Sequence, residues 1–355
     1  MAEMTSHERF KRMFEHREAD RVPMVDAPWG TTIERWQGEG LPKDVDWGDY
    51  FDMDIDAGIN LDNSPHLPCE TIEETEEYIT RTNDWGTTYK VWKHATSTPD
   101  FIGHTIVDFD SWKKVKKLIT PDRSRIGWGH LKTHYATWRE DGRWLAGNMW
   151  FGFDVTHAWM VGTERTLMAL IEEPEWIVDM WNHQLDVQLV LLDMLYAEGY
   201  TVDELFWCDD LGYKGTTFFS AQMYRDLLKP VVKRACDWAH AHDVYTHLHS
   251  CGNISQLIPE FIDAGVDALN PLEVKAGIDP VALKKQYGDQ LVLHGGINAM
   301  LWDNIDAISA EMKRVIPEVK KSGGYIFSSD HSVPDSVSFE NFRYIIELAR
   351  ELGTY

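Results

Sequence analysis

The sequence is poor in basic residues relative to acidic ones. Its 34 Lys and Arg stand against 58 Asp and Glu, which gives a formal charge of −24. A nucleic-acid-binding surface needs clustered Lys and Arg to neutralise phosphates, and an anionic membrane repels an acidic chain. The one dense basic run, 113–117, alternates with Trp112, Val115 and Leu118 at helical spacing and predicts a solvated helix face. We therefore expect neither a nucleic-acid partner nor a membrane partner.

Long apolar runs and paired cysteines are also missing. No segment approaches the roughly 18 uninterrupted apolar residues of a membrane-spanning helix. The first residues lack the apolar stretch and the small-residue cleavage site of a secretory signal. The four cysteines are widely scattered, which is typical of reduced thiols. These features predict a cytoplasmic protein.

What the sequence does contain is a repeated alternation of strands and helices. Helical patterns occur at 174–198, 221–241, 254–264 and 305–321. The strand-like runs are 22–28, 51–59, 144–151, 203–210, 244–251, 268–273, 291–298 and 325–332. Repeated β–α units with short connections predict a parallel sheet, and eight of them close a barrel. The predicted fold class is α/β, a single (β/α)8 TIM barrel.

One segment interrupts this alternation. Residues 78–107 are rich in Thr, Tyr and Trp and read as extended stretches with turns. We interpret them as a peripheral β-hairpin insertion. No linker rich in Pro, Gly or Ser divides the chain, so residues 1–355 are expected to form one barrel domain.

Polar residues follow the apolar body of several predicted strands. In a parallel barrel these residues line the mouth at the carboxyl ends, where barrel enzymes hold their chemistry. Asp, Asn and Ser can also cap the next helix, but capping does not require His, Cys or Glu. We expect one cavity to be bordered by Asp26, Asp210, His249, Cys251, Glu273, His294 and His331.

The sharpest local motif is THLHSCGN at 246–253. Residues two apart on a strand point the same way, so His247, His249 and Cys251 share one predicted face. An imidazole with a thiolate suits zinc, and a catalytic zinc needs a third protein ligand. The alternative is a buried cysteine beside a hydrogen-bonded core histidine. The candidates for the third ligand are His331, Glu273, Asp209, Asp210 and His294.

Several motifs resemble the uroporphyrinogen decarboxylase superfamily. They are DRVP at 20–23, WQGEGLP at 36–42, LGYK at 211–214, FFS at 218–220, HSCGN at 249–253, NPLE at 270–273, GGYI at 323–326 and DHSVP at 330–334. They occur in the family's order over almost the whole chain. This superfamily also contains zinc-dependent, corrinoid-linked methyltransferases of the O-demethylase and coenzyme M methyltransferase-like branch.

Two departures bear on the reaction. True uroporphyrinogen decarboxylases carry an arginine-rich segment after the first strand, but residues 26–32 read DAPWGTT, with no arginine before Arg35. A porphyrinogen with many carboxylates would therefore find no arginine side chains in this segment to bind them. The corrinoid-linked enzymes use a later cysteine as third zinc ligand, and here 328–332 read SSDHS. The resemblance thus implies zinc held by His249, Cys251 and His331, and a chain that is not a true uroporphyrinogen decarboxylase.

The first functional hypothesis is a zinc-assisted methyltransferase. It moves a methyl group between a small molecule of the methyl ether or thiol class and a corrinoid carried by a partner protein. The catalytic candidates are Asp210, Glu273, His294 and Asp330. The expected substrate pocket contains Asp26, Trp29, Trp150, Trp207 and Asn270.

Two alternatives remain open at this point. One is a metal-free decarboxylase of a small or porphyrin-like carboxylate, with proton donors among Asp210, His249, His294 and Asp330. The other is a barrel that binds a small molecule or a corrinoid protein without catalysis. Titratable groups gather at the strand ends, and this favours an enzyme.

Overall fold

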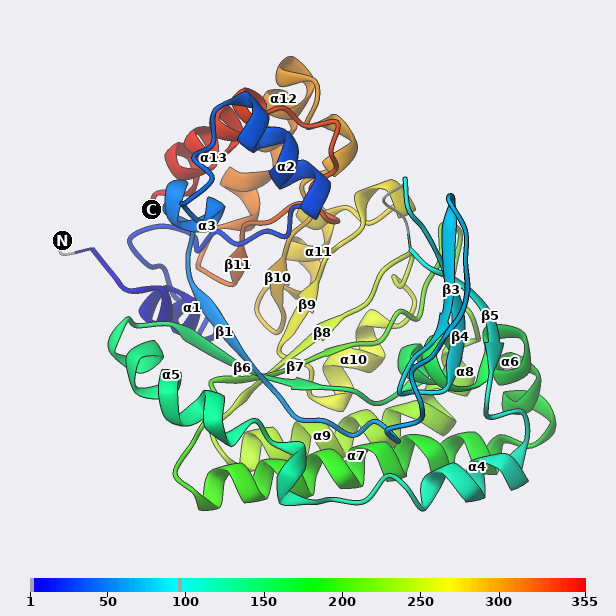
Figure 1. Cartoon of the computed structure of the whole chain (residues 1–355). Helices are drawn as coiled ribbons and strands as arrows, with labels where there is room; N and C mark the ends of the chain where they lie inside the picture. Colours follow the sequence, from blue (N-terminus) through cyan, green and yellow to red (C-terminus); the bar gives the residue numbers. More distant parts are fainter. Residues whose placement is uncertain (1–2, 95–97) are drawn as a thin grey trace.

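The computed structural model describes residues 3–94 and 98–355, and its main element is a parallel sheet. Seven strands are hydrogen-bonded in the order β1-β6-β7-β8-β9-β10-β11. The strands are β1 Asp56–Asn60, β6 Trp144–Met149, β7 Glu204–Cys208, β8 Tyr245–His249, β9 Ala268–Asn270, β10 Val292–His294 and β11 Tyr325–Ile326. The sheet is curled, with helices on its outer side (Figure 1). The fold is therefore α/β and TIM-barrel-like.

The predicted first strand, 22–28, is not a regular strand. It makes isolated parallel bridges from Met24 to Phe327 and from Pro28 to Val333, and the Met24 carbonyl accepts a bond from the Asp54 amide at 2.9 Å. Pro23 and Pro28 have no N–H to donate, so a continuous ladder cannot form here. An irregular extended segment thus takes the place of the eighth strand between β11 and the residues before β1.

The strands β6 to β11 are shorter than predicted at their carboxyl ends. Pro271 cannot extend β9, and Gly295 and Gly296 follow β10 with φ of 101° and 77°. Upstream, the predicted strand 51–59 begins only at Asp56, because the residues before it follow the short helix α3. The polar residues of the predicted strand ends therefore lie on loops at the barrel mouth.

Helices cover the outer side of the sheet. They are α1 Ser6–Phe14, α2 Gly30–Glu39, α3 Trp47–Tyr50, α4 Phe109–Lys116, α5 Trp128–Glu140, α6 Thr163–Glu172, α7 Pro174–Ala197, α8 Ala221–Met223, α9 Lys229–Ala241, α10 Ile258–Ala264, α11 Pro280–Tyr287, α12 Ile305–Val319 and α13 Phe339–Gly353. Short 3-10 or π turns complete them: η1 Arg123–Arg125, η2 Val155–Val161, η3 Tyr224–Leu228, η4 Val274–Ala276 and η5 Ala299–Leu301. The basic run falls on α4 and the residue after it; Trp112 and Val115 are buried, whereas Leu118, beyond the end of the helix, is exposed. No helix among the described residues is long and apolar enough to cross a bilayer.

The predicted hairpin is a four-stranded antiparallel sheet. Its strands, in spatial order, are β2 Thr71–Glu74, β3 Tyr78–Thr82, β4 Thr87–Trp92 and β5 Asp100–His104. The prediction missed β2 because all four of its residues are exposed and give no apolar alternation. This sheet stands beside the mouth of the parallel sheet (Figure 1). His104 Nε2 anchors it to the carbonyl of Ala158 in η2 at 3.1 Å.

Candidate active site at the carboxyl ends of the strands

A cavity of about 590 Å³ runs through the parallel sheet to its carboxyl end; we call it the central cavity. Of the residues predicted for the site, it is lined by Asp26, Trp29, Asp210, His249, Cys251, Asn270, His294 and His331. Its described lining also includes the acidic residues Asp56 and Glu204 but no Lys or Arg. The walls thus offer carboxylates and imidazoles, and they offer no cationic clamp for a substrate with several carboxylates.

Three donor side chains converge at the mouth of this cavity. The ligand atoms of Asp210, His249 and Cys251 all lie within 4.8 Å of one another. Cys251 Sγ is 3.3 Å from His249 Nε2, which is 3.7 Å from Asp210 Oδ1. His249 ends β8 and pairs in register with Cys208 of β7. Cys251 and Asp210 lie two positions after these residues, so they meet at the same edge of the sheet. The donor set is one nitrogen, one sulfur and one oxygen.

Asn270 sets the orientation of the His249 ring. Its Oδ1 lies 2.5 Å from His249 Nδ1. An amide oxygen only accepts, so Nδ1 carries the proton and Nε2 presents its lone pair to Cys251 and Asp210. Such a partner on the second ring nitrogen is typical of histidines that bind metals.

The electrostatics of the same three residues favour a cation among them. Burial raises the pKa of the Cys251 thiol above its ordinary range, and the charges of Asp210 and Glu273 raise it further. Burial also raises the pKa of Asp210, while His249 opposes the shift. Two buried acidic groups that disfavour each other's ionisation lose their protons more readily when a metal ion lies between them.

The third donor of this group is Asp210, where the sequence predicted His331. His331 lines the central cavity but does not belong to the converging group. Since β11 ends at Ile326, residues 327–332 form a loop instead of the predicted strand end. Ser329 ties this loop to Asp26 by its amide at 2.9 Å and its hydroxyl at 2.7 Å. Burial and the charge of Lys275 lower the pKa of His331.

Glu273 and Asp330, two carboxylates that were predicted to be catalytic, accept hydrogen bonds from loop amides. Glu273 accepts the Gly252 amide at 2.6 Å and pairs with Lys275 at 3.2 Å. Asp330, fully buried, accepts the amides of Ala299 at 2.7 Å and Val274 at 2.9 Å. Neither lines the central cavity, so these residues fix the loops that follow β8, β9 and β10.

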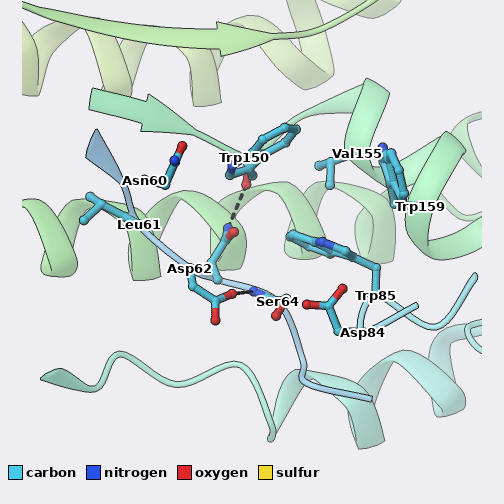
Figure 2. Close-up of a pocket in the computed structure, with 10 residues that line it drawn as sticks. Asn60, Leu61, Asp62, Ser64, Asp84, Trp85, Trp150, Val155 and Trp159 are labelled. Carbon is cyan, nitrogen blue, oxygen red and sulfur yellow. Dashed lines mark hydrogen bonds between the residues drawn. The ribbon is translucent and has the colours of Figure 1, made fainter. Parts of the chain in front are cut away.

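The three predicted pocket tryptophans lie in three different environments. Trp29 lines the central cavity, whereas Trp150 lines a separate cavity shown in Figure 2. Trp207 is fully buried in the hydrophobic core and lines neither. Side chains alternate along β7, and its neighbour Phe206 faces the central cavity. The prediction therefore chose the wrong face of β7.

A hydrogen-bonded chain of three residues lines the central cavity; its His294 was predicted as catalytic, whereas Glu204 and His247 were not. Glu204 Oε2 lies 3.0 Å from His247 Nδ1, and His247 Nε2 lies 3.2 Å from His294 Nδ1. A carboxylate accepts from Nδ1–H of His247, so His247 Nε2 accepts from His294 and leaves His294 Nε2 as an acceptor. Burial lowers the pKa of His294 well below its ordinary value, which keeps its ring neutral. The same-face spacing of His247 and His249 on β8 was the sequence signal for this chain.

Asp26 is a carboxyl group of the central cavity whose pKa is shifted towards neutral pH. Burial raises its pKa to about 6, although the hydrogen bonds from Ser329 and Ala27 lower it. Groups with such values serve as proton donors or acceptors near pH 7.

Comparisons with known proteins agree with this fold. A methyltransferase from Methanosarcina mazei has a similar structure, with a TM-score of 0.66 and 16% identity over 98% of this chain and 99% of the other. A B12-independent methionine synthase from a Shewanella species has a TM-score of 0.44 and 10% identity over 95% of this chain and 94% of the other. No curated protein matches the sequence. The family described as uroporphyrinogen decarboxylase (URO-D) matches residues 97–352, and the chain belongs to this family.

Proposed function

We propose that this protein is a zinc-assisted methyltransferase that exchanges a methyl group between a small thiol or methyl ether and a corrinoid carried by a partner protein. The observation that carries the proposal is the convergence of the ligand atoms of His249, Cys251 and Asp210 within 4.8 Å of one another in the lining of the central cavity. The remaining wall of the cavity leaves room for a small molecule beside them.

The donor set fits zinc. One imidazole, one thiolate and one carboxylate are ligands that zinc accepts, and a three-ligand site keeps a position for substrate. When bound there, zinc would supply Lewis acidity that lowers the pKa of a substrate thiol or polarises the oxygen of a methyl ether. Asn270 holds His249 in the tautomer that binding requires, with its Oδ1 2.5 Å from Nδ1.

Side chains of the central cavity would accept or donate the proton that each reaction moves. In transfer to a thiol, the S–H proton passes to an acceptor of the cavity, for which His294 Nε2 is placed by His247 and Glu204. The sulfur then forms the S–C bond, the cobalt–carbon bond of the methylated corrinoid breaks, and its electron pair stays on cobalt. In ether cleavage the methyl C–O bond would break, the methyl group would pass to the reduced cobalt of the corrinoid, and the leaving oxygen would take a proton, which Asp26 holds below about pH 6.

The charge of the central cavity disfavours porphyrinogen decarboxylation. A substrate with several carboxylates needs arginine or lysine partners, and none of the described lining residues is either. The carboxylates of Asp26, Asp56 and Glu204 would repel such a substrate. This supports a small substrate of low negative charge.

The test is methyl transfer from methylcobalamin to 2-mercaptoethanesulfonate by the zinc-loaded protein, followed by the visible absorbance of the corrinoid. We expect turnover that falls at least 100-fold in Cys251→Ser and is retained in Cys208→Ser, a half-buried cysteine outside the converging group. Turnover that survives both zinc removal and Cys251→Ser contradicts the proposal, as does release of CO2 from a small carboxylate by the metal-free protein.

A further inference from the structure

A second cavity lies at the same end of the barrel and differs in chemistry from the first. It has a volume of about 300 Å³ and contains three tryptophans, so we call it the tryptophan cavity. Trp150 follows β6, Trp159 belongs to η2, and Trp85 comes from the turn between β3 and β4. Parallel sheet, π-helix and antiparallel sheet each contribute one indole ring (Figure 2).

Two buried polar atoms of residues around this cavity have no hydrogen-bond partner among the described residues. Asn63 is fully buried, and its Nδ2 donates to the Trp150 carbonyl at 2.7 Å while its Oδ1 has no partner. The buried hydroxyl of Ser64 has none either. Leaving such buried groups unpaired costs free energy. The residues around the cavity therefore carry unsatisfied polar atoms behind its aromatic lining.

The carboxylates of the cavity are unequally neutralised. Asp62 pairs with His66 and lies 3.8 Å from Arg125. Asp84, beside Trp85 in Figure 2, has no side-chain hydrogen bond or ion pair with any residue that the structure describes. No Lys or Arg occurs in the described lining, and no described cationic side chain stacks on its three indole rings.

We infer that the tryptophan cavity binds an alkylated ammonium cation, with the indole faces around its methyl groups and Asp84 as its counter-ion. Aromatic faces attract cations through the ring quadrupole, most strongly with tryptophan, and cages of this kind recognise quaternary ammonium groups. A small metal ion is strongly hydrated and needs several anionic ligands, and the described residues here form no such group.

The two cavities are adjacent. Asn60 ends β1 and lines the tryptophan cavity, and its Oδ1 accepts a bond from Nδ2 of Asn148 at 2.8 Å. Asn148 lines the central cavity. A cation in the tryptophan cavity would therefore lie one pair of side chains away from the central cavity. The inference goes beyond the proposed methyl transfer and does not depend on it.

Calorimetric titration of the full chain with choline and with its uncharged isostere 3,3-dimethylbutan-1-ol tests the inference. We expect saturable binding of choline, at least tenfold tighter than that of the isostere. Equal affinity for the two indicates a merely apolar cavity, and no saturable binding of choline means that the cavity is not a cation site. Either result overturns the inference.

Variants locate the binding. Asp84→Asn keeps the shape and removes the charge, and we expect choline affinity to fall at least tenfold; Trp85→Leu should do the same. Asp100→Asn and Trp92→Leu are the matched controls, on exposed positions of the same antiparallel sheet. Thermal melting verifies folding.

Choline binding that is unchanged in Asp84→Asn, or equally weakened in the controls, contradicts the inference. Cys251→Ser should leave choline binding intact, which separates this result from a failure of the methyltransferase proposal.

Discussion

The central cavity and the tryptophan cavity lie at one end of the sheet, and they differ in whether their polar side chains are hydrogen-bonded. In the central cavity, Glu204, His247 and His294 bond to one another, and Asn270 bonds to His249. In the tryptophan cavity, the acceptors of Asn63 and Ser64 remain unpaired. Paired groups have fixed tautomers, which metal binding and proton transfer require, whereas unpaired acceptors beside aromatic rings are suited to holding a guest.

The largest expected effect concerns the metal ligands of the central cavity. His249→Ala removes the only nitrogen donor of the converging group, and we expect zinc affinity to fall more than 100-fold. Chelator competition measures the affinity, and metal analysis gives the stoichiometry. Asp84→Asn, in the other cavity, is the control and should bind zinc as the parent does. A loss of zinc in both variants would erase the distinction between the two cavities.

A smaller effect is expected from the residue that orients His249. Asn270→Ala leaves all three donors in place but frees His249 Nδ1, which now has Asn270 Oδ1 at 2.5 Å. Partners of this kind contribute about 10–100-fold to metal affinity. We expect a loss within that range, measured as above, with Asn270→Asp restoring the acceptor and most of the affinity. An Asn270→Ala variant with parental affinity would show that the tautomer is set in another way.

Much of the central cavity follows from the period of the strands. The THLHSC motif of β8 placed His249 and Cys251 on one face because their spacing is two, and the two side chains do meet, at 3.3 Å. The same rule misled the prediction on β7, since choosing Trp207 instead of Phe206 reverses the face. The local pattern gives the period, but the register of each strand depends on its neighbours.

Other features depend on how distant segments meet. Asp210, and not His331, joins His249 and Cys251 in the converging group, since β11 ends at Ile326 and the following loop bonds to Asp26. The prolines at 23 and 28 are visible in the sequence and do explain the irregular first strand. The tryptophan cavity joins residues from β1, the β3–β4 turn and η2, and no local spacing brings these together.

The smallest expected effect is a pH-dependent stability difference from Asp26 in the central cavity. Burial raises the pKa of Asp26 from its ordinary value of 3.8 to about 6. The folded state therefore binds this proton more tightly than the unfolded state does. The cost of ionising Asp26 is absent below about pH 4, grows as the pH rises, and is complete above about pH 6. The parent should thus lose stability relative to Asp26→Asn, by about 1 kcal/mol between pH 5 and pH 7. Urea unfolding of both proteins at several pH values measures this stability difference.

Ser329→Ala removes the 2.7 Å hydrogen bond to Asp26. It should move the pH range over which the stability difference changes to higher pH. A difference between parent and Asp26→Asn that stays constant from pH 5 to pH 7 would mean that Asp26 is solvated as at the surface, and it would remove Asp26 as the proton donor for ether cleavage.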